Sequence, residues 1–347
     1  MLDDTSDRVA ARPIRLSDGP RYLFVRALEA CNAGCTMCGF AFSKQSFRMS
    51  ADELREVGRR AFEAGVRFVR FTGGEPLLHR EIVVIVRWLS ELGLRCSIIT
   101  NGALLVKRLD ALAEAGLEQV IVSIDSPVPQ HHDRIRRVHG LQVRALDGLR
   151  AAIAAGLRSR VNTVCGPDNF RQMPALQNLL TRMGVEQWEL SSLKLERRLD
   201  YTRRDRNDVE RVVRYVYEQG RCEGRLVPFG KPWCGATAEE RRRYFETGVT
   251  PRPDGRCHVV KYVRYLDART KRLFPCSLLP HRPHAESIAD QIEEWSQFAV
   301  DGRAVQACAD RFFVEGPSKC TGCSTTAAGF SNDIGRDETV RDVDWAY

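Results

Sequence analysis

The chain has 347 residues, enough for one large catalytic domain and a smaller appended one. Its 43% hydrophobic and 28% charged residues are typical of a globular protein, and no apolar run approaches the roughly 18–20 residues that cross a bilayer, so we expect no membrane partner. The formal net charge of +8 comes mostly from scattered arginines, and the densest cluster, residues 240–243, includes an acid and no aromatic residue, which argues against a nucleic-acid partner.

Short β-like segments alternate with helical ones from residue 22 to residue 196. Strands are expected at residues 22–26, 66–71, 96–100, 119–124, 159–164 and 187–193, and helices at residues 50–64, 81–92, 104–115, 143–155 and 173–183. Ser50 and Glu53 form a capping box that opens the first helix. Parallel strands need crossover connections, so six β-α units predict a parallel sheet covered by helices. The outcome is an open partial barrel or a doubly wound sheet, and in both folds ligands bind at the carboxyl ends of the strands.

The alternation stops after a helix expected at residues 208–218. A stretch rich in Gly, Pro and charge follows at residues 220–250 and indicates a domain boundary. Beyond it we expect a hairpin at residues 259–266 and 271–275, a helix at residues 288–298 and a cysteine-bearing tail. The predicted organisation is an N-terminal extension (1–20), the α/β barrel (21–222) and a small C-terminal cysteine-rich α+β domain (223–347).

Twelve cysteines carry more information than the bulk composition. The acidic first residues lack the apolar core of a signal peptide, so we expect a cytoplasmic location, where closely spaced cysteines favour metal over disulfides. Cys31, Cys35 and Cys38 directly follow the first strand, in a loop that Gly34 is expected to help turn. Three thiolates leave one iron of a 4Fe–4S cluster open, which is a reactive arrangement. The alternative is structural zinc with a distant fourth ligand such as His79.

A second motif stands where the next strand ends, at Thr72-Gly73-Gly74-Glu75-Pro76. Glycines there let the backbone approach a ligand closely, and the edge supplies acceptors for the amino group of a bound amino acid. In this spacing and order, the cysteine motif and the Gly-Gly-Glu-Pro motif together resemble the radical S-adenosylmethionine (SAM) superfamily. The resemblance covers about residues 22–195.

The resemblance implies a partial (β/α)6 barrel of the TIM type. It also implies a 4Fe–4S cluster on Cys31, Cys35 and Cys38, whose free iron chelates SAM. One-electron reduction would then cleave SAM to methionine and a 5′-deoxyadenosyl radical that abstracts a substrate hydrogen, with a flavodoxin or ferredoxin as the expected reductant.

Further positions are similar to the family's SAM contacts. Met37 stands where an aromatic residue usually precedes the third cysteine, a departure that affects packing. His132-Asp133-Arg134-Ile135-Arg136 is similar to the family's loop after the fourth strand. The complete set of SAM-binding candidates is Met37, Gly73, Gly74, Glu75, Pro76, Thr100, Asn101, Ser123, Asp125 and Asn162.

The region beyond the barrel resembles the SPASM/twitch extension of the same superfamily. Its four candidate metal ligands are Cys257, Cys276, Cys320 and Cys323. Four thiolates make a closed site that suits a second, auxiliary 4Fe–4S cluster, with structural zinc as the alternative. Cys234 or Cys308 could replace one member.

The sequence is less informative about the substrate. The overall layout is similar to radical SAM enzymes of antibiotic pathways that act on small molecules, and implies a lyase that decarboxylates an anionic sugar nucleoside, cytosylglucuronic acid being the best candidate. The alternatives are a SPASM-type peptide maturase and a non-catalytic iron–sulfur or zinc protein.

Glu189 and Lys194 on the sixth strand are the candidate catalytic residues. Alternation places Glu189 and Ser191 on one face, and Lys194 on the other side or beyond the strand end. Glu189 could bind a sugar hydroxyl or move a proton near the radical; the alternative is a salt bridge on an edge strand.

Overall fold

The structure is a computed structural model that describes residues 13–15, 20–38, 47–192, 203–229, 237–247, 256–277, 293–294, 309–310, 313–314 and 339–341. Within these residues, nine strands form one sheet in the order β10-β9-β8-β2-β3-β4-β5-β6-β7, and β1 pairs with β11 in a separate ribbon. Six strands of the large sheet correspond to the six strands predicted from the sequence. In the structure they are β2 (Tyr22–Arg26), β3 (Phe68–Thr72), β4 (Arg95–Thr100), β5 (Leu117–Ser123), β6 (Arg158–Cys165) and β7 (Gln187–Ser192). The separate ribbon consists of β1 (Pro13–Arg15) and β11 (Thr339–Arg341).

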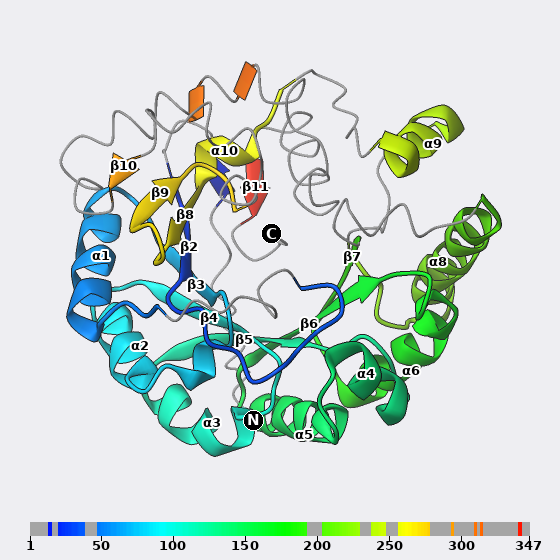
Figure 1. Cartoon of the computed structure of the whole chain (residues 1–347), viewed down its shortest axis with the longest axis horizontal. Coiled ribbons are helices and arrows are strands. Elements are labelled where there is room, and N and C mark those ends of the chain that lie inside the picture. The colour runs from blue at the N-terminus through cyan, green and yellow to red at the C-terminus, as the bar shows by residue number, and fades with distance from the viewer. Residues whose placement is uncertain are drawn as a thin grey trace, which may run out of the picture.

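Helices cover the outer face of the parallel strands, as the β-α alternation predicts. Figure 1 shows the curved sheet inside an arc of helices from α1 to α8. These helices are α1 (Ala51–Glu63), α2 (Ile82–Glu91), α3 (Leu105–Glu114), α4 (Pro129–Arg136), α5 (Leu141–Ala154), α6 (Met173–Met183) and α8 (Arg203–Glu223). The predicted partial (β/α)6 barrel is therefore confirmed.

Local sequence signals set the start and the contacts of α1. The predicted capping box is present, because the Ser50 side chain accepts a hydrogen bond from the Glu53 backbone N–H while the Glu53 carboxylate accepts one from Ser50 N–H. Leu54 and Val57 are buried. Gly58 allows α1 and α2 to approach, because an added Cβ would lie 2.0 Å from the Leu89 Cδ2 atom. Each buried aliphatic side chain contributes about 1.5–3 kcal/mol to this packing.

The region after residue 222 differs most from expectation. A helix, α9 (Ala238–Thr247), lies in the stretch expected to be a boundary, and residues 259–262 form a helical turn, α10 (Val259–Tyr262), instead of the start of the hairpin. The hairpin consists of β8 (Val263–Asp267) and β9 (Arg272–Phe274). β10 (Glu293–Glu294) pairs with β9 inside the segment predicted to be the helix 288–298, so that prediction is wrong for these two residues.

Both edges of the six-stranded barrel are paired with chain from beyond residue 222. β8 runs parallel to β2, with Leu23 opposite Arg264, and extends the sheet. At the other edge, Phe229 donates its N–H to the Trp188 carbonyl, and Leu190 donates to the Phe229 carbonyl. The sequence did not predict this continuity of the sheet, because nothing local specifies pairing between residues 241 positions apart at one edge and 39 positions apart at the other.

Buried charges join the first barrel strand to β8. Arg26 at the end of β2 donates to both carboxylate oxygens of Asp267 at 3.3 Å and also pairs with Glu29. Asp267 is fully buried and Arg26 is 1% exposed. Burial lowers the pKa of Arg26, and the charge of Asp267 opposes this effect.

Asp267→Ala is expected to lower the free energy of unfolding by about 3 kcal/mol, because it leaves part of a buried cation uncompensated. The measurement is urea unfolding of the metal-free chain. Asp147→Ala is the matched control, since Asp147 pairs with Arg150 where both side chains are more than half exposed, at 53% and 56%; it should change stability by less than about 1 kcal/mol. Equal effects of the two substitutions would contradict a structural role for the buried pair.

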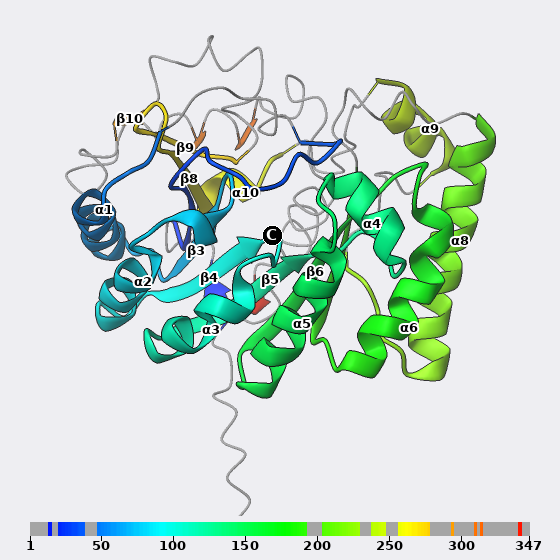
Figure 2. The same ribbon diagram turned by 60° about the horizontal axis from the view of Figure 1, so that its bottom comes forward.

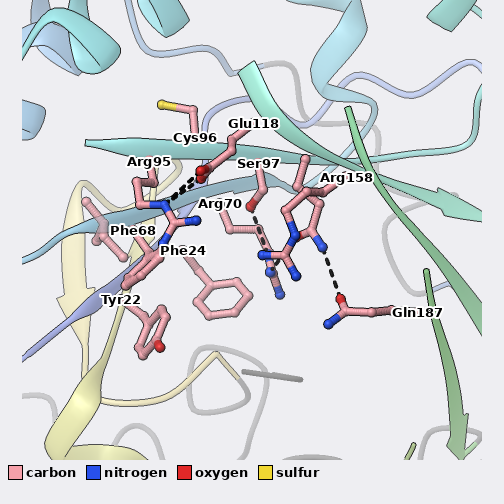
Figure 3. Close-up of a pocket in the computed structure, with 12 residues that line it drawn as sticks. Tyr22, Phe24, Phe68, Arg70, Arg95, Cys96, Ser97, Glu118, Arg158 and Gln187 are labelled. Carbon is pink, nitrogen blue, oxygen red and sulfur yellow. Dashed lines mark hydrogen bonds and ion pairs between the residues drawn. The ribbon is translucent and has the colours of Figure 1, made fainter. Parts of the chain in front are cut away.

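Polar side chains, together with aromatic ones such as Phe24 and Phe68, line the amino-terminal end of the barrel (Figure 3). Arg70 donates to Ser97 Oγ at 3.0 Å and to Gln119 Oε1 at 3.3 Å, and Gln119 donates to Gln187 Oε1 at 3.0 Å. The cavity at this end has a volume of about 30 Å³, which is far below the roughly 300–1,000 Å³ of small-molecule sites. A substrate must therefore bind elsewhere.

No helix within the described residues is both long enough and apolar enough to span a membrane.

Candidate active site

A larger cavity, of about 410 Å³, opens at the carboxyl ends of the strands. Its volume lies in the usual range of small-molecule sites. It is lined by side chains or backbone from the cysteine loop and from the ends of β3 to β7. The lining residues are Cys31, Ala33, Cys35, Met37, Cys38, Thr72, Gly73, Gly74, Glu75, Ile99, Thr100, Asn101, Ser123, Arg136, Asn162, Val164, Glu189 and Ser191. The structure thus brings the three motif cysteines together with eight of the ten predicted SAM-binding residues.

The Gly-Gly pair packs against the backbone that leads into the cysteine loop. Gly74 N–H donates to the Leu28 carbonyl at 3.1 Å, and Glu75 N–H donates to the Ala30 carbonyl at 2.8 Å. A Cβ added to Gly74 would lie 2.1 Å from the Ala30 carbonyl oxygen and 2.4 Å from that of Glu29. Gly73 has φ +120°, a conformation that L-residues rarely adopt. These glycines therefore serve the approach of two protein backbones, in addition to any approach to a ligand.

Gly34 does not have the role expected from the sequence. It does not adopt a positive φ, and an added Cβ would make ordinary contacts with the Arg137 side chain, at 3.6 and 3.7 Å. The loop is instead held by backbone hydrogen bonds, in which Gly34 N–H donates to the Arg136 carbonyl at 3.2 Å and Thr36 N–H to the Ile135 carbonyl at 2.9 Å.

The three thiols fit an iron–sulfur cluster better than a zinc site completed by His79. His79 is fully buried, its Nε2 lies 2.8 Å from the Met49 carbonyl oxygen, and its Nδ1 accepts from Glu81 N–H at 3.3 Å, so both ring nitrogens are engaged. Within the described residues no three His, Cys, Asp or Glu side chains are grouped to hold a single metal ion. A cluster distributes its thiolates over several irons and does not require such a grouping. Desolvation by the surrounding chain raises the pKa of Cys31 to about 11, and it also raises the pKa of Cys35. Metal binding must therefore displace the protons of these thiols.

Glu75 joins the ends of β3 and β4. It is 1% exposed and accepts from Thr100 Oγ at 2.7 Å, from Asn101 N–H at 2.8 Å and from Leu77 N–H at 3.1 Å. Burial raises the pKa of the Glu75 carboxyl, and these hydrogen bonds oppose that shift. Asn101 in turn donates to Asn32 Oδ1 at 2.7 Å, which connects the strand end to the cysteine loop. Glu75 thus orients the cavity wall around the positions expected to contact SAM.

Two predicted SAM-binding residues lie outside the cavity lining. Pro76 is buried as the first residue of a 3-10 turn, Pro76–Leu78. Asp125 is fully buried, and its carboxylate accepts from Arg136 Nε at 2.6 Å and from Val164 N–H at 3.0 Å. Asp125 therefore supports Arg136, which lines the cavity but is not among the SAM-binding residues that the sequence predicts. The HDRIR motif that contains Arg136 is the signal that could have identified it.

Glu189 lies on the cavity side of β7 together with Ser191, while the Trp188 side chain is buried on the opposite side and donates to Thr163 Oγ at 3.0 Å. Glu189 also forms a salt bridge with Arg160, which is 1% exposed. Arg160 donates to Asn162 Oδ1 at 2.9 Å as well, and Asn162 is opposite Glu189 in the β6–β7 register. Glu189 thus both lines the cavity and forms an ion pair, which were the two alternatives expected from the sequence. The ion pair is buried. Alternation along β6 places Arg160 on the same face as Asn162, which is the sequence signal for this partner.

Some of the remaining predicted site residues belong to the part of the chain that the structure describes, and others do not. Cys257 precedes α10 and Cys276 follows β9, so both flank the same end of the β8–β9 hairpin. Cys320, Cys323 and Lys194 lie outside the described residues, as do the alternatives Cys234 and Cys308.

The fold is a parallel α/β partial barrel with a cavity at the carboxyl ends of its strands. Residues 25–180 match the sequence model of the family described as the Radical SAM superfamily. This segment contains the three motif cysteines, the Gly-Gly-Glu-Pro motif and strands β3 to β6.

Individual relatives share parts of this chain. A probable GTP 3′,8-cyclase of Sulfurisphaera tokodaii is 34% identical over 174 residues, which cover 49% of this chain and 55% of that protein. A PqqA peptide cyclase of a Methylobacterium species is 30% identical over 216 residues, or 60% of this chain and 57% of that protein. The solved structure of Streptococcus suis SuiB bound to S-adenosylmethionine has a TM-score of 0.59 at 17% identity, covering 76% of this chain and 61% of that chain, and supports the fold alone. The chain spans about half the length of the curated relatives that it matches, at 47 to 56% for three of them.

Proposed function

We propose that this protein is a radical SAM enzyme. The observation that carries the proposal is that the Cys31, Cys35 and Cys38 loop, the Gly-Gly-Glu edge and the ends of four further strands line one cavity. The three thiolates would hold a 4Fe–4S cluster there, and that cluster would supply the one-electron reduction of bound SAM by which radical SAM enzymes abstract hydrogen from a substrate.

The chain's own residues would hold and orient the reactants. The three thiolates would ligate the cluster, and the Gly73–Gly74 backbone beside them would face the amino acid part of SAM. The rest of the SAM molecule would contact Thr100, Asn101, Ser123 and Asn162. Because Glu75 fixes the β4 end and Arg136 fixes the cysteine loop, the cavity is organised before SAM binds, which reduces the cost of positioning.

Glu189 suits recognition of a hydrogen-bond donor on the substrate. Its carboxylate is buried, faces the cavity and is paired with Arg160 behind it. An ionised carboxylate accepts hydrogen bonds, so its natural partner is a sugar hydroxyl or an amine. Arg136, the cation among the described lining residues, is already paired with Asp125. Among the described lining residues, this arrangement favours recognition of a substrate with several hydroxyl groups or an amino group over recognition of a free carboxylate.

Decarboxylation of cytosylglucuronic acid, as by the cytosylglucuronate decarboxylase of blasticidin S biosynthesis, is the most specific form of the proposal. Its sugar hydroxyls suit Glu189 and Ser191, whereas its carboxylate needs a cation such as Lys194. The second candidate is a peptide maturase, which is favoured by the likeness to a PqqA peptide cyclase. The GTP 3′,8-cyclase relative supports a nucleotide or nucleoside substrate instead.

Anaerobic reconstitution tests the radical SAM proposal. Protein loaded with iron and sulfide should form 5′-deoxyadenosine from SAM when dithionite supplies electrons. A brown protein that forms none would indicate an iron–sulfur electron carrier, and a colourless zinc protein would indicate a binding role. Transfer of deuterium from sugar-deuterated cytosylglucuronic acid into 5′-deoxyadenosine would select the nucleoside candidate, and absence of transfer would exclude it.

Glu189→Gln should slow product formation by about 10- to 100-fold, the effect of losing a charge-assisted hydrogen bond, while SAM cleavage stays within about threefold. The measurement compares product and 5′-deoxyadenosine in the same reaction. Glu186→Gln is the matched control, because Glu186 is 47% exposed and lies outside the cavity lining. Ser191→Ala, which leaves Arg160 paired, checks that an effect does not come from the broken ion pair. Unchanged product formation in Glu189→Gln would remove Glu189 from the mechanism.

We also propose an auxiliary 4Fe–4S cluster on Cys257, Cys276, Cys320 and Cys323, within a domain that spans residues 223–347 after a barrel at residues 21–222. A flavodoxin or ferredoxin of the cytoplasm would reduce the enzyme. Loss of about half of the bound iron in Cys276→Ala, with the catalytic cluster retained, would support the second cluster. Loss of zinc instead would establish the structural alternative.

A further inference from the structure

The end of α4 is attached to the cysteine loop by backbone and side chain together. The carbonyls of Ile135 and Arg136 accept hydrogen bonds from Thr36 and Gly34, on either side of Cys35. In Figure 2, α4 lies at the same end of the barrel as the cysteine loop, above α5 and α6. The position of Cys35 relative to the end of this helix is therefore fixed by two hydrogen bonds.

The Arg136 side chain is oriented toward the sulfur of Cys35. Its Nη1 donates to Cys35 Sγ at 3.7 Å, and its Nε donates to Asp125 Oδ2 at 2.6 Å. The Arg136 side chain is 11% exposed, and that of Asp125 is fully buried. Because Asp125 also accepts from Val164 N–H, the carboxylate is fixed to the end of β6 and in turn holds the guanidinium in place.

A buried guanidinium beside a thiolate ligand affects a cluster through its charge. Reduction adds one negative charge to the cluster, and a nearby cation with an N–H···S hydrogen bond stabilises the reduced state more than the oxidised one. Low solvent exposure keeps this interaction from being screened. Asp125 counteracts it, since its negative charge is adjacent to the same guanidinium.

We propose that Arg136, acting through Cys35, raises the reduction potential of the catalytic cluster, and that Asp125 both positions Arg136 and limits its effect. This inference rests on the proposed function, namely that Cys31, Cys35 and Cys38 hold a 4Fe–4S cluster.

The test is a redox titration of the reconstituted full-length protein without SAM, followed by the electron paramagnetic resonance signal of the reduced catalytic cluster. Arg136→Gln should shift the one-electron equilibrium at least about tenfold toward the oxidised state, which is 59 mV toward more negative potential. Arg136→Lys, which keeps the charge, should shift it less. Arg134→Gln is the matched control: it removes the same charge from an exposed position of the same helix and should leave the potential unchanged.

Asp125→Asn provides a test of opposite sign. Asparagine keeps an oxygen that can accept from Arg136 Nε, so the guanidinium stays in place while the negative charge is removed, and the potential should move upward. General disorder of the site would instead move both variants in the same direction. An unchanged potential in a loaded Arg136→Gln protein, or an equal shift in Arg134→Gln, would overturn the inference. If Arg136→Gln fails to load iron, the direction of the Asp125→Asn shift decides. Absence of any cluster in the unsubstituted protein would instead overturn the proposed function itself.

Discussion

Cys35→Ala is expected to abolish the catalytic cluster and, with it, SAM cleavage. Cys35 is the buried member of the three motif cysteines and the one held beside Arg136, so its loss leaves two thiolates for the cluster. The loss of 5′-deoxyadenosine formation should exceed the 10- to 100-fold that removal of an outer-shell partner of a metal ligand typically causes. Iron content, the visible absorption of the cluster and 5′-deoxyadenosine formation measure the effect.

Cys96→Ala is the matched control for this substitution. Cys96 is also buried, and burial raises its pKa to about 12, but it lines the small cavity at the amino-terminal end of the barrel. We expect full iron loading and unchanged SAM cleavage, because Cys96 packs as a small apolar side chain. Normal SAM cleavage in Cys35→Ala would refute the assignment of the catalytic cluster to this loop.

Gly74→Ala should disorganise the cysteine loop without altering any proposed ligand. The added Cβ would lie 2.1 Å and 2.4 Å from two backbone carbonyl oxygens, which cannot move aside as a flexible side chain can. Forced displacement of packed groups costs about 3 kcal/mol, and here it falls on the chain entering the cluster loop. The expected results are a lower unfolding midpoint and a large loss of bound iron in the reconstituted protein.

Gly34→Ala serves as the control within the same loop, because its added Cβ would make contacts no shorter than 3.6 Å. It should retain stability and iron. If Gly34→Ala were the more damaging of the two, the loop would depend on its own turn rather than on contact with the β3 end.

Local sequence patterns were sufficient to predict most of the barrel. Alternation of short apolar segments with amphipathic ones located β2 to β7, and the Ser50–Glu53 capping box located the start of α1, because these signals depend on neighbouring residues. Helix α4 lies where the family resemblance implies a loop, although Pro129 at its start is a signal for a helix.

The partners of the site residues could not be predicted in the same way. Arg26 and Asp267 are 241 positions apart, and their contact depends on the pairing of β2 with β8. The roles of Gly74 and Asp125 depend on which backbone or side chain lies opposite in three dimensions. Glu189 is an intermediate case, because alternation gave its face of β7 while the ion pair required the register with β6.

The pairing at both edges of the barrel has a consequence for folding and solubility. An open barrel has two edge strands with unpaired N–H and C=O groups, which are templates for aggregation. Here β8 occupies the edge of β2, and the segment at Phe229 occupies the edge of β7. A chain ended at residue 222 would keep all six barrel strands and lose both covers. We therefore expect a chain that lacks the C-terminal region to self-associate more readily than the whole chain.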